Sequence, residues 1–303
     1  MSGEPAIRRP RHWGRVLTAM VTPFDREGRL DLDAARRLAR WLASRHTDGL
    51  VLAATTGEAP VLSDAEKRDL VRAVSEAVTI PVIAGTGTND TAHTVALTRE
   101  ARSLGAAGVI LVSPYYNRPP QAGIEAHFRA AAAATDLPVM LYDVPLRTGR
   151  RVAADVLLRL FRDVPNIVAL KDATGDPPAA AALIARAGER LDLYAGDDGY
   201  ALALAAVGAV GIVGTSTHWT SPQFHEMFAA LERADVAGAQ RIHARLIESF
   251  EFINSDTSVF SMSIKAMLRA IGQEVGDCRL PLPPAPPEMA VRAKAVWERL
   301  NRP

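Results

Sequence analysis

The chain contains one cysteine, Cys278, among 303 residues, so it cannot form an intrachain disulfide. No apolar run is long enough to cross a bilayer, and the basic amino terminus is not followed by the apolar segment of a signal peptide. With 35 basic and 34 acidic residues, the net charge is +1 and no basic block stands out, which argues against nucleic acid as the main partner. These absences favour a cytoplasmic protein that acts on small molecules, away from membranes and nucleic acid.

Sequence motifs of cofactor and metal chemistry are missing as well. No G-x-G-x-x-G follows the first predicted strand, and neither H-E-x-x-H nor G-x-S-x-G occurs. The seven histidines are scattered, and the glycine-rich stretches "GTGTND" and "GIVGTS" lack the lysine of a phosphate-binding loop. We therefore expect a protein that needs neither a cofactor nor a metal ion.

Lysine is scarce, because arginine supplies most of the positive charge. The four lysines are Lys67, Lys171, Lys265 and Lys294. Lys171 directly follows the apolar run 167–170, "IVAL", which is typical of a buried strand. Such a lysine either emerges at the strand end and pairs with an acid such as Asp172, or stays buried and loses its proton more easily. A neutral amine is a nucleophile, and arginine cannot supply one.

Short apolar runs alternate with alanine- and arginine-rich stretches of helical period, and the alternation repeats eight times. The runs span 15–22, 48–54, 80–87, 108–114, 137–145, 166–173, 191–198 and 208–216. Continuous hydrophobicity is typical of parallel strands that are covered on both faces. The pattern predicts an α/β fold, a (β/α)8 barrel over residues 12–220. A doubly wound sheet of Rossmann type is the alternative architecture.

Residues 221–303 are predicted to form helices that pack on the barrel as an extension. We expect the first of them to open with Ser221 as its cap and Pro222 in its first turn. Within the barrel, Ser63 and Glu66 have the spacing of a capping box at the start of a helix.

The carboxyl ends of the predicted strands carry the residues of chemical interest, because active sites of such barrels form there. These residues are Thr55, Thr56, Tyr115, Tyr116, Tyr142, Arg147 and Lys171. Each alone has an ordinary structural explanation, such as a turn threonine, a core tyrosine or a surface arginine. Their convergence on one rim favours a Schiff-base enzyme, in which an amine attacks a ketone, hydroxyls move protons and N–H groups hold a carboxylate.

Five ordered motifs, "TTGE", "PYYNRPP", "YDVPLRTG", "LKDATGD" and "AGDD", resemble the dihydrodipicolinate synthase and N-acetylneuraminate lyase family of pyruvate-dependent class I aldolases. The resemblance runs from about residue 14 to 282. It implies that Lys171 forms the Schiff base with pyruvate. It also implies a proton relay of Tyr142, Thr55 and Tyr116, with Tyr116 contributed by a neighbouring subunit.

The same resemblance implies how the substrates are held. Thr56 matches the clamp on the pyruvate carboxylate, and Gly196 and Val213 match positions at the pyruvate end of the pocket. Arg147 matches the arginine that binds the carboxylate of aspartate semialdehyde, as a guanidinium fork can. A cross-subunit tyrosine implies at least a dimer, and the family's habit suggests a dimer of dimers.

The second substrate stays open at this point. The expected reaction is condensation of pyruvate with aspartate semialdehyde, and the alternative is a related aldolase that cleaves or forms a 4-hydroxy-2-oxo acid or a sugar acid. A non-catalytic sensor on the same fold is a third possibility. Four residues depart from the family pattern: Ala54, Asp143, His218 and Trp219. They bear on the choice of substrate, because a bulky Trp219 at the rim would reshape the second-substrate pocket.

The resemblance extends to the site where some members bind the inhibitor lysine. Asn89 and Tyr115 match that site, whereas Asp64, Lys67 and His93 replace its histidines and glutamate. We therefore expect weak or no inhibition by lysine.

Overall fold

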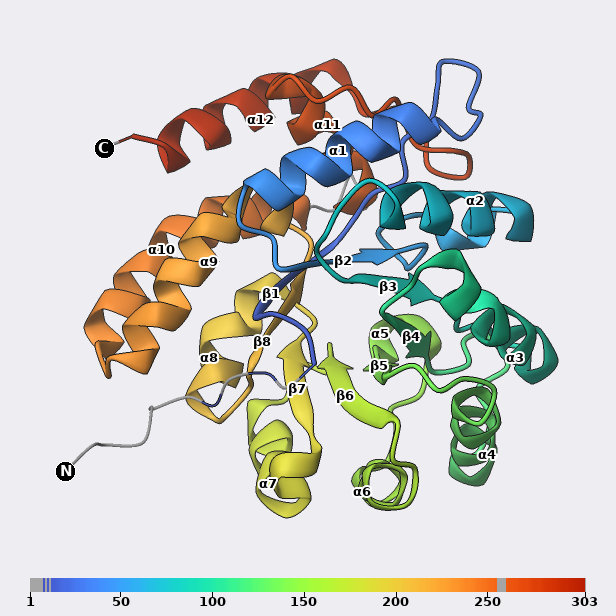
Figure 1. Ribbon diagram of the computed structural model, residues 1–303. Coiled ribbons are helices and arrows are strands. Elements are labelled where there is room, and N and C mark those ends of the chain that lie inside the picture. Colours follow the sequence, from blue (N-terminus) through green and yellow to red (C-terminus); the bar gives the residue numbers. More distant parts are fainter. Residues whose placement is uncertain (1–7, 9, 11, 255–259, 303) are drawn as a thin grey trace.

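Eight parallel strands close into a barrel in sequence order in the computed structural model, which describes residues 8, 10, 12–254 and 260–302 (Figure 1). The strands are β1 Val16–Ala19, β2 Gly49–Leu52, β3 Val82–Gly85, β4 Gly108–Val112, β5 Val139–Asp143, β6 Ile167–Asp172, β7 Asp192–Ala195 and β8 Gly211–Gly214. All eight predicted strands are present, each shorter than its apolar run, and the predicted barrel is confirmed.

Helices follow the strands and surround the barrel. Those of the first seven units are α1 Leu32–Ser44, α2 Asp64–Ser75, α3 Thr91–Glu100, α4 Gln121–Ala132, α5 Pro145–Thr148, α6 Ala154–Asp163, α7 Pro177–Ala187 and α8 Ala201–Ala206. The remaining helices are α9 Thr217–Glu232, α10 Val236–Ile253, α11 Phe260–Ala270 and α12 Pro287–Leu300. The expected capping box at α2 is confirmed, because Ser63 accepts from the Glu66 N–H and Glu66 accepts from the Ser63 N–H.

The strands are apolar on both sides because each side is covered. Residues that point into the barrel form one cluster, which includes Leu17, Val51, Ile83, Ile110, Met140, Tyr142, Ala169, Tyr194 and Val213. Alternate residues of the same strands pack outward against the helices in a second, larger cluster. Side chains at a strand's last inward position, and those of the loops that follow, can therefore reach the carboxyl end of the barrel.

The register of β5 and β6 sets the orientation of four polar side chains. Tyr142 lies opposite Lys171, and Asp143 lies opposite Asp172. Because side chains alternate along a strand, Tyr142 and Lys171 share the inner face with Ala169, whereas the two aspartates face outward. Asp172 accepts a hydrogen bond from the Thr174 N–H on that outer side, so it is not the ion-pair partner that an emerging lysine would need.

The predicted start of the helix after β8 is wrong. Helix α9 begins at Thr217, with the N–H groups of Trp219 and Thr220 donating to the Ser216 carbonyl. Ser221 is inside the helix, where its hydroxyl donates to the Thr217 carbonyl, and Pro222 is an internal proline. The expected boundary between residues 220 and 221 thus falls within the helix of the eighth unit.

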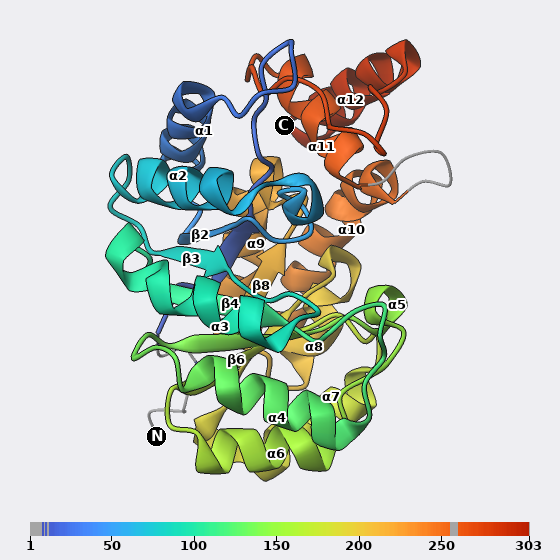
Figure 2. The same ribbon diagram turned by 90° about the vertical axis from the view of Figure 1, so that its right-hand side faces the viewer.

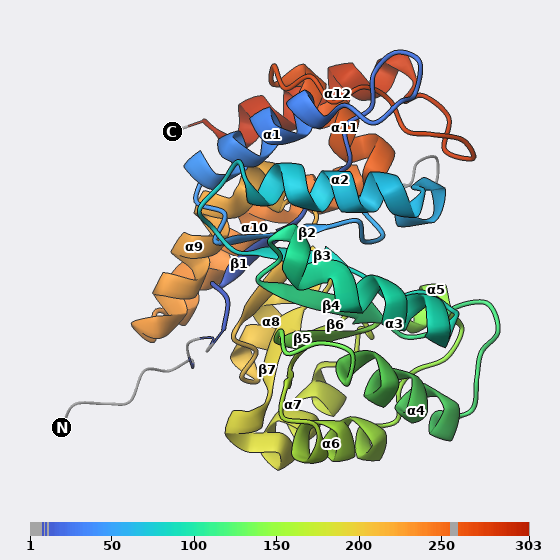
Figure 3. The same cartoon turned by 45° about the vertical axis from the view of Figure 1, so that its right-hand side comes forward.

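The last helices cover one side of the barrel. In Figures 2 and 3, α11 and α12 lie toward the same end of the molecule as α1 and α2, at the top of both views. Arg279, in the segment between α11 and α12, pairs with Glu66 of α2 at 2.5 Å. The carboxy-terminal segment is therefore joined to the loops and helices near β2, far away in the sequence. Among the described residues, no helix is long and apolar enough to cross a membrane.

Candidate active site

Lys171 is the centre of the candidate site. It occupies the last inward position of β6, and only 4% of the residue is exposed. Burial, which disfavours the charged ammonium, lowers the pKa of Lys171 to about 8, while Asp198 and Asp197 oppose that change and Arg147 adds to it. An amine in this position is far easier to deprotonate than an exposed lysine.

Tyr142 lies directly beside the amine. The Lys171 Nζ is 4.4 Å from the centre of the Tyr142 ring. Burial raises the pKa of Tyr142 to about 12, although Arg147 and the Thr55 side chain favour the phenolate. The hydroxyl consequently keeps its proton at neutral pH and can pass it to, or take it back from, a neighbouring group.

The loop after β2 brings backbone donors to the same place. It is closed by a hydrogen bond from the Glu58 N–H to the Thr55 carbonyl, and the Gly57 carbonyl accepts from the Thr22 hydroxyl at 2.6 Å. The N–H groups of Thr56 and Gly57 have no acceptor within the described part of the chain. A Cβ on Gly57 would lie 3.0 Å from the Met20 carbonyl oxygen, so the turn is built around glycine. Free N–H groups in such a turn form an anion-binding concavity.

Asp198 organises the opposite wall. Its buried carboxylate accepts from the hydroxyls and the N–H groups of Thr215 and Ser216, with both hydroxyl contacts at 2.6 Å. These bonds join the loop after β7 to the loop after β8. Sequence reasoning missed Asp198; the signal available was its place in "AGDD", at the end of a predicted strand.

These residues line one cavity of about 130 Å³. Thr55, Thr56, Tyr142, Lys171 and Gly196 all contribute to its wall, together with Arg147. The volume suits a molecule of a few heavy atoms rather than a large cofactor. Within the described residues no group of three or more histidine, cysteine or acidic side chains could hold a metal ion.

Arg147 stands at the mouth. It belongs to the short helix α5 and is exposed to solvent, with its guanidinium carbon 4.5 Å from the centre of the Phe260 ring. Phe260 is the first residue of α11 and also lines the cavity. The arginine is thus braced against an aromatic face, with its donors open to an incoming carboxylate.

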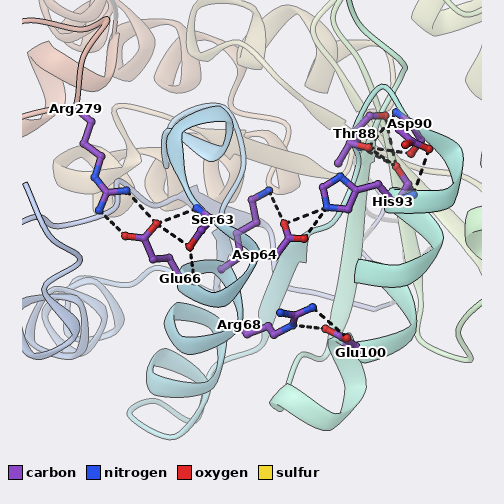
Figure 4. Close-up of polar contacts among 11 residues, drawn as sticks. Ser63, Asp64, Glu66, Arg68, Thr88, Asp90, His93, Glu100 and Arg279 are labelled. Carbon is purple, nitrogen blue, oxygen red and sulfur yellow. Dashed lines mark hydrogen bonds and ion pairs between the residues drawn. The ribbon is translucent and has the colours of Figure 1, made fainter.

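A second cavity, of about 450 Å³, adjoins the first and shares Thr55, Tyr142 and Arg147 with it. Its far end is lined by Asp64, Lys67, Asn89, His93 and Tyr115. The Asp64 carboxylate is 2.9 Å from His93 Nε2 and 3.6 Å from Lys67 Nζ. Figure 4 shows Asp64 facing the His93 ring, on the same helix whose Glu66 faces Arg279.

Two predicted site residues are not brought to Lys171 within this chain. Tyr116 is 91% exposed, with a left-handed backbone (φ 69°), and it does not line the cavity of its own chain. Val213 is fully buried in the inward-facing cluster that contains Tyr142, and it is not part of the cavity wall.

The expectation that Trp219 reshapes the pocket is wrong. Trp219 is fully buried between α9 and α10, where its indole N–H donates to Ser249 and its ring packs edge-on against Phe252. His218 is buried too, accepting from the Val21 N–H and contacting the Thr215 carbonyl. Both side chains follow β8 within the first turn of α9, which turns them into the core.

The comparisons with known proteins agree with this geometry. The model of the dihydrodipicolinate synthetase family matches residues 12–299. The 4-hydroxy-tetrahydrodipicolinate synthase of Acidothermus cellulolyticus is 47% identical over 289 residues, covering 94% of this chain and 92% of the relative. The chain belongs to the dihydrodipicolinate synthetase family.

Two solved structures are similar throughout. The enzyme of Cyanidioschyzon merolae, determined with lysine bound, has a TM-score of 0.93 at 37% identity, covering 96% of this chain and 99% of that one. The dihydrodipicolinate synthase of Acinetobacter baumannii, complexed with pyruvate, has a TM-score of 0.88 at 32% identity, covering 94% and 98%.

Proposed function

We propose that this chain is a class I, Schiff-base-forming lyase. Its particular reaction is the condensation of pyruvate with aspartate semialdehyde to 4-hydroxy-tetrahydrodipicolinate. The observation that carries the proposal is the buried Lys171, whose lowered pKa of about 8 leaves roughly a tenth of the amine neutral at pH 7. It stands beside Tyr142 and across the cavity from the loop of Thr55 and Thr56. The names of the relatives support the same reaction.

The first half of the reaction uses the inner cavity. The neutral Lys171 amine attacks the keto carbon of pyruvate, and loss of one water gives the imine. Tyr142 and Thr55 carry the protons that this exchange requires, with Tyr116 of a neighbouring subunit as the third member of the relay. The N–H groups of Thr56 and Gly57 and the Thr56 hydroxyl hold the pyruvate carboxylate. Gly196 lines the pyruvate end, and Val213 packs in the apolar cluster with Tyr142.

The second half of the reaction takes place at the mouth of the cavity. Loss of a proton from the pyruvate methyl group gives the enamine, whose carbon attacks the aldehyde of the second substrate. The amine of that substrate then displaces Lys171 from the imine carbon, which closes the ring and frees the lysine. Arg147, braced by Phe260, binds the second carboxylate in two hydrogen bonds.

A neighbouring subunit is part of the proposal. Tyr116 is 91% exposed and Leu146, which lines the inner cavity, is 94% exposed, so both are available to a second copy of the chain. We assign at least a dimer, and a dimer of dimers as the full assembly, in the cytoplasm where pyruvate is available. We also retain the helices that follow the barrel as its extension and not as an independent domain.

Borohydride trapping tests the proposal. Reduction in the presence of pyruvate should add the mass of the reduced pyruvate adduct at Lys171 and leave the other buried lysine, Lys265, unmodified. Turnover should then require aspartate semialdehyde, with a 4-hydroxy-2-oxo acid and a sugar acid assayed on the same preparation. An unlabelled Lys171, under conditions that label an authentic relative, would refute the Schiff-base function. Faster cleavage of a hydroxy-oxo acid would refute the assigned substrate alone.

A further inference from the structure

Helix α11 contacts the loop 55–58 at two points that lie one helical turn apart. The Ser261 hydroxyl donates to the Thr56 carbonyl at 3.0 Å. Four residues later, the Lys265 Nζ lies 2.7 Å from the Glu58 carboxylate. Residues at this spacing share one face of a helix, so a single face of α11 touches two members of the loop.

The second contact, between Lys265 and Glu58, is a fully buried ion pair. The side chains of Lys265 and Glu58 are 1% and 2% exposed. The Lys265 ammonium also donates to the Asp277 carbonyl at 2.9 Å and lies 4.2 Å from the centre of the Phe24 ring. The second oxygen of Glu58 accepts from the Arg279 N–H at 2.9 Å.

Stability alone does not account for such a pair. Removing two ions from water costs several kcal/mol for each ion, and well-packed apolar side chains of the same volume often stabilise a fold equally well. What the buried ion pair adds is a fixed position for the two side chains and for the backbone that carries them. Glu58 itself has a left-handed backbone (φ 57°), a conformation that an L-residue holds only under external constraint.

The contact to Thr56 has a direct geometric consequence. In a planar trans peptide, the carbonyl and the following N–H point in opposite directions. The Thr55 carbonyl is fixed by the Glu58 N–H, which sets the direction of the Thr56 N–H. The Thr56 carbonyl is fixed by Ser261, so the Gly57 N–H points away from α11. These are the two N–H groups to which the proposed function assigns the pyruvate carboxylate.

We propose that Ser261 and Lys265 are positioning residues for the carboxylate-binding loop: the helical extension sets the affinity of the barrel for pyruvate. This inference rests on the proposed function, and neither side chain touches the substrate. Ser261 sets the peptide plane between Thr56 and Gly57, and Lys265 holds the loop's last residue, Glu58, in place.

The test compares two buried serines of the extension. Ser261→Ala removes the contact to the loop, whereas the control Ser249→Ala removes only the acceptor of the Trp219 indole N–H. The measurement is the pyruvate concentration that gives half-maximal borohydride trapping of Lys171, recorded together with the melting temperature. We expect Ser261→Ala to raise that concentration about 2- to 10-fold, the equivalent of one hydrogen bond, with kcat changed less. Ser249→Ala should lower the melting temperature and leave that concentration unchanged.

Lysine variants test the ion pair. In Lys265→Met the Glu58 carboxylate is buried without its partner, so half-maximal trapping at a fixed pH should need more pyruvate than in the wild type. The double variant Glu58→Gln with Lys265→Met should recover much of this loss at the same pH, because it buries no unpaired carboxylate. If both Lys265→Met and Ser261→Ala bind pyruvate as the wild type does while melting earlier, the positioning role is wrong and the contacts are structural. A wild type that traps no pyruvate would instead refute the proposed function.

Discussion

Replacing Asp143 by asparagine should make the protein more stable in neutral and alkaline solution. Asp143 is 1% exposed at the end of β5 and faces the outer layer of the barrel, opposite Asp172. Its Oδ2 accepts one hydrogen bond, from the Val152 N–H, and its Oδ1 has no partner among the described residues. Burial raises the pKa of Asp143 to about 7, and the Asp172 charge adds to the effect of burial.

The direction of the pH effect follows from the proton balance. Asp143 has an ordinary pKa near 3.8 in the unfolded chain and about 7 in the folded one. Between these values the folded state binds more protons at Asp143, so the contribution of Asp143 to stability is fully present below pH 4 and is lost as the pH rises through about 7. At roughly 1.4 kcal/mol for each unit of pKa difference, the loss by pH 8 is at most about 4 kcal/mol. An amide at this position has no proton to lose, so it avoids the loss.

The assay is chemical denaturation at pH 5 and pH 8, with the protein concentration fixed because assembly affects apparent stability. We expect Asp143→Asn to be more stable than the wild type at pH 8, with a smaller or no advantage at pH 5. Asp48→Asn is the matched control of opposite sign. Burial opposes ionisation of Asp48 as well, but His225 and two backbone N–H groups outweigh burial and lower the pKa of Asp48. An Asp143→Asn variant whose difference from the wild type is the same at both pH values would refute the reasoning.

Three further predictions concern the mouth and its surroundings. Arg147→Ala should raise the KM for the aldehyde substrate about 10- to 100-fold, because charge-assisted hydrogen bonds are lost. The pyruvate concentration that gives half-maximal trapping should stay unchanged. An equal rise in that concentration would contradict the role assigned to Arg147. Trp219→Phe should lower the melting temperature but leave both KM values within about twofold, since Trp219 packs between α9 and α10; steady-state kinetics would expose a direct role in the pocket. Millimolar lysine should not slow the enzyme, because the Lys67 ammonium and its partner Asp64 line the adjoining cavity; a clear inhibition curve would overturn this.

The barrel was predictable because burial on both faces leaves a simple trace in a sequence. Each strand reads as an unbroken apolar run, and eight such runs separated by helical stretches fit few architectures. The inner cavity was predictable for a related reason. Thr55 directly follows an apolar run, Tyr142 and Lys171 lie near the ends of theirs, and the carboxyl ends of parallel strands meet at one rim.

Features that depend on side-chain direction were not predictable in this way. The stretch after β8 was expected to present Trp219 to the pocket, but the helix begins at once and turns the indole toward Ser249. Ser221 and Pro222 looked like a helix start because the same residues can occupy a cap or an interior turn.

Contacts between residues far apart in the sequence were also not predictable. Lys265 was noticeable only as one of four lysines, within the apolar stretch "SIKAML", and nothing local indicates that its partner is Glu58. A lysine buried in an amphipathic helix must have a counter-charge, so the sequence could have raised the question. The answer required the fold.

The bond between Ser261 and the carbonyl of Thr56 joins residues 205 positions apart. A ribosome adding about 5–20 residues per second therefore finishes the loop 55–58 about 10–40 s before it supplies the helix that holds it. A nascent chain that has completed all eight strands consequently still lacks the two contacts by which α11 holds this loop. If Ser261 and Lys265 position the loop as proposed, the affinity for pyruvate reaches its final value only after the last helices have been made.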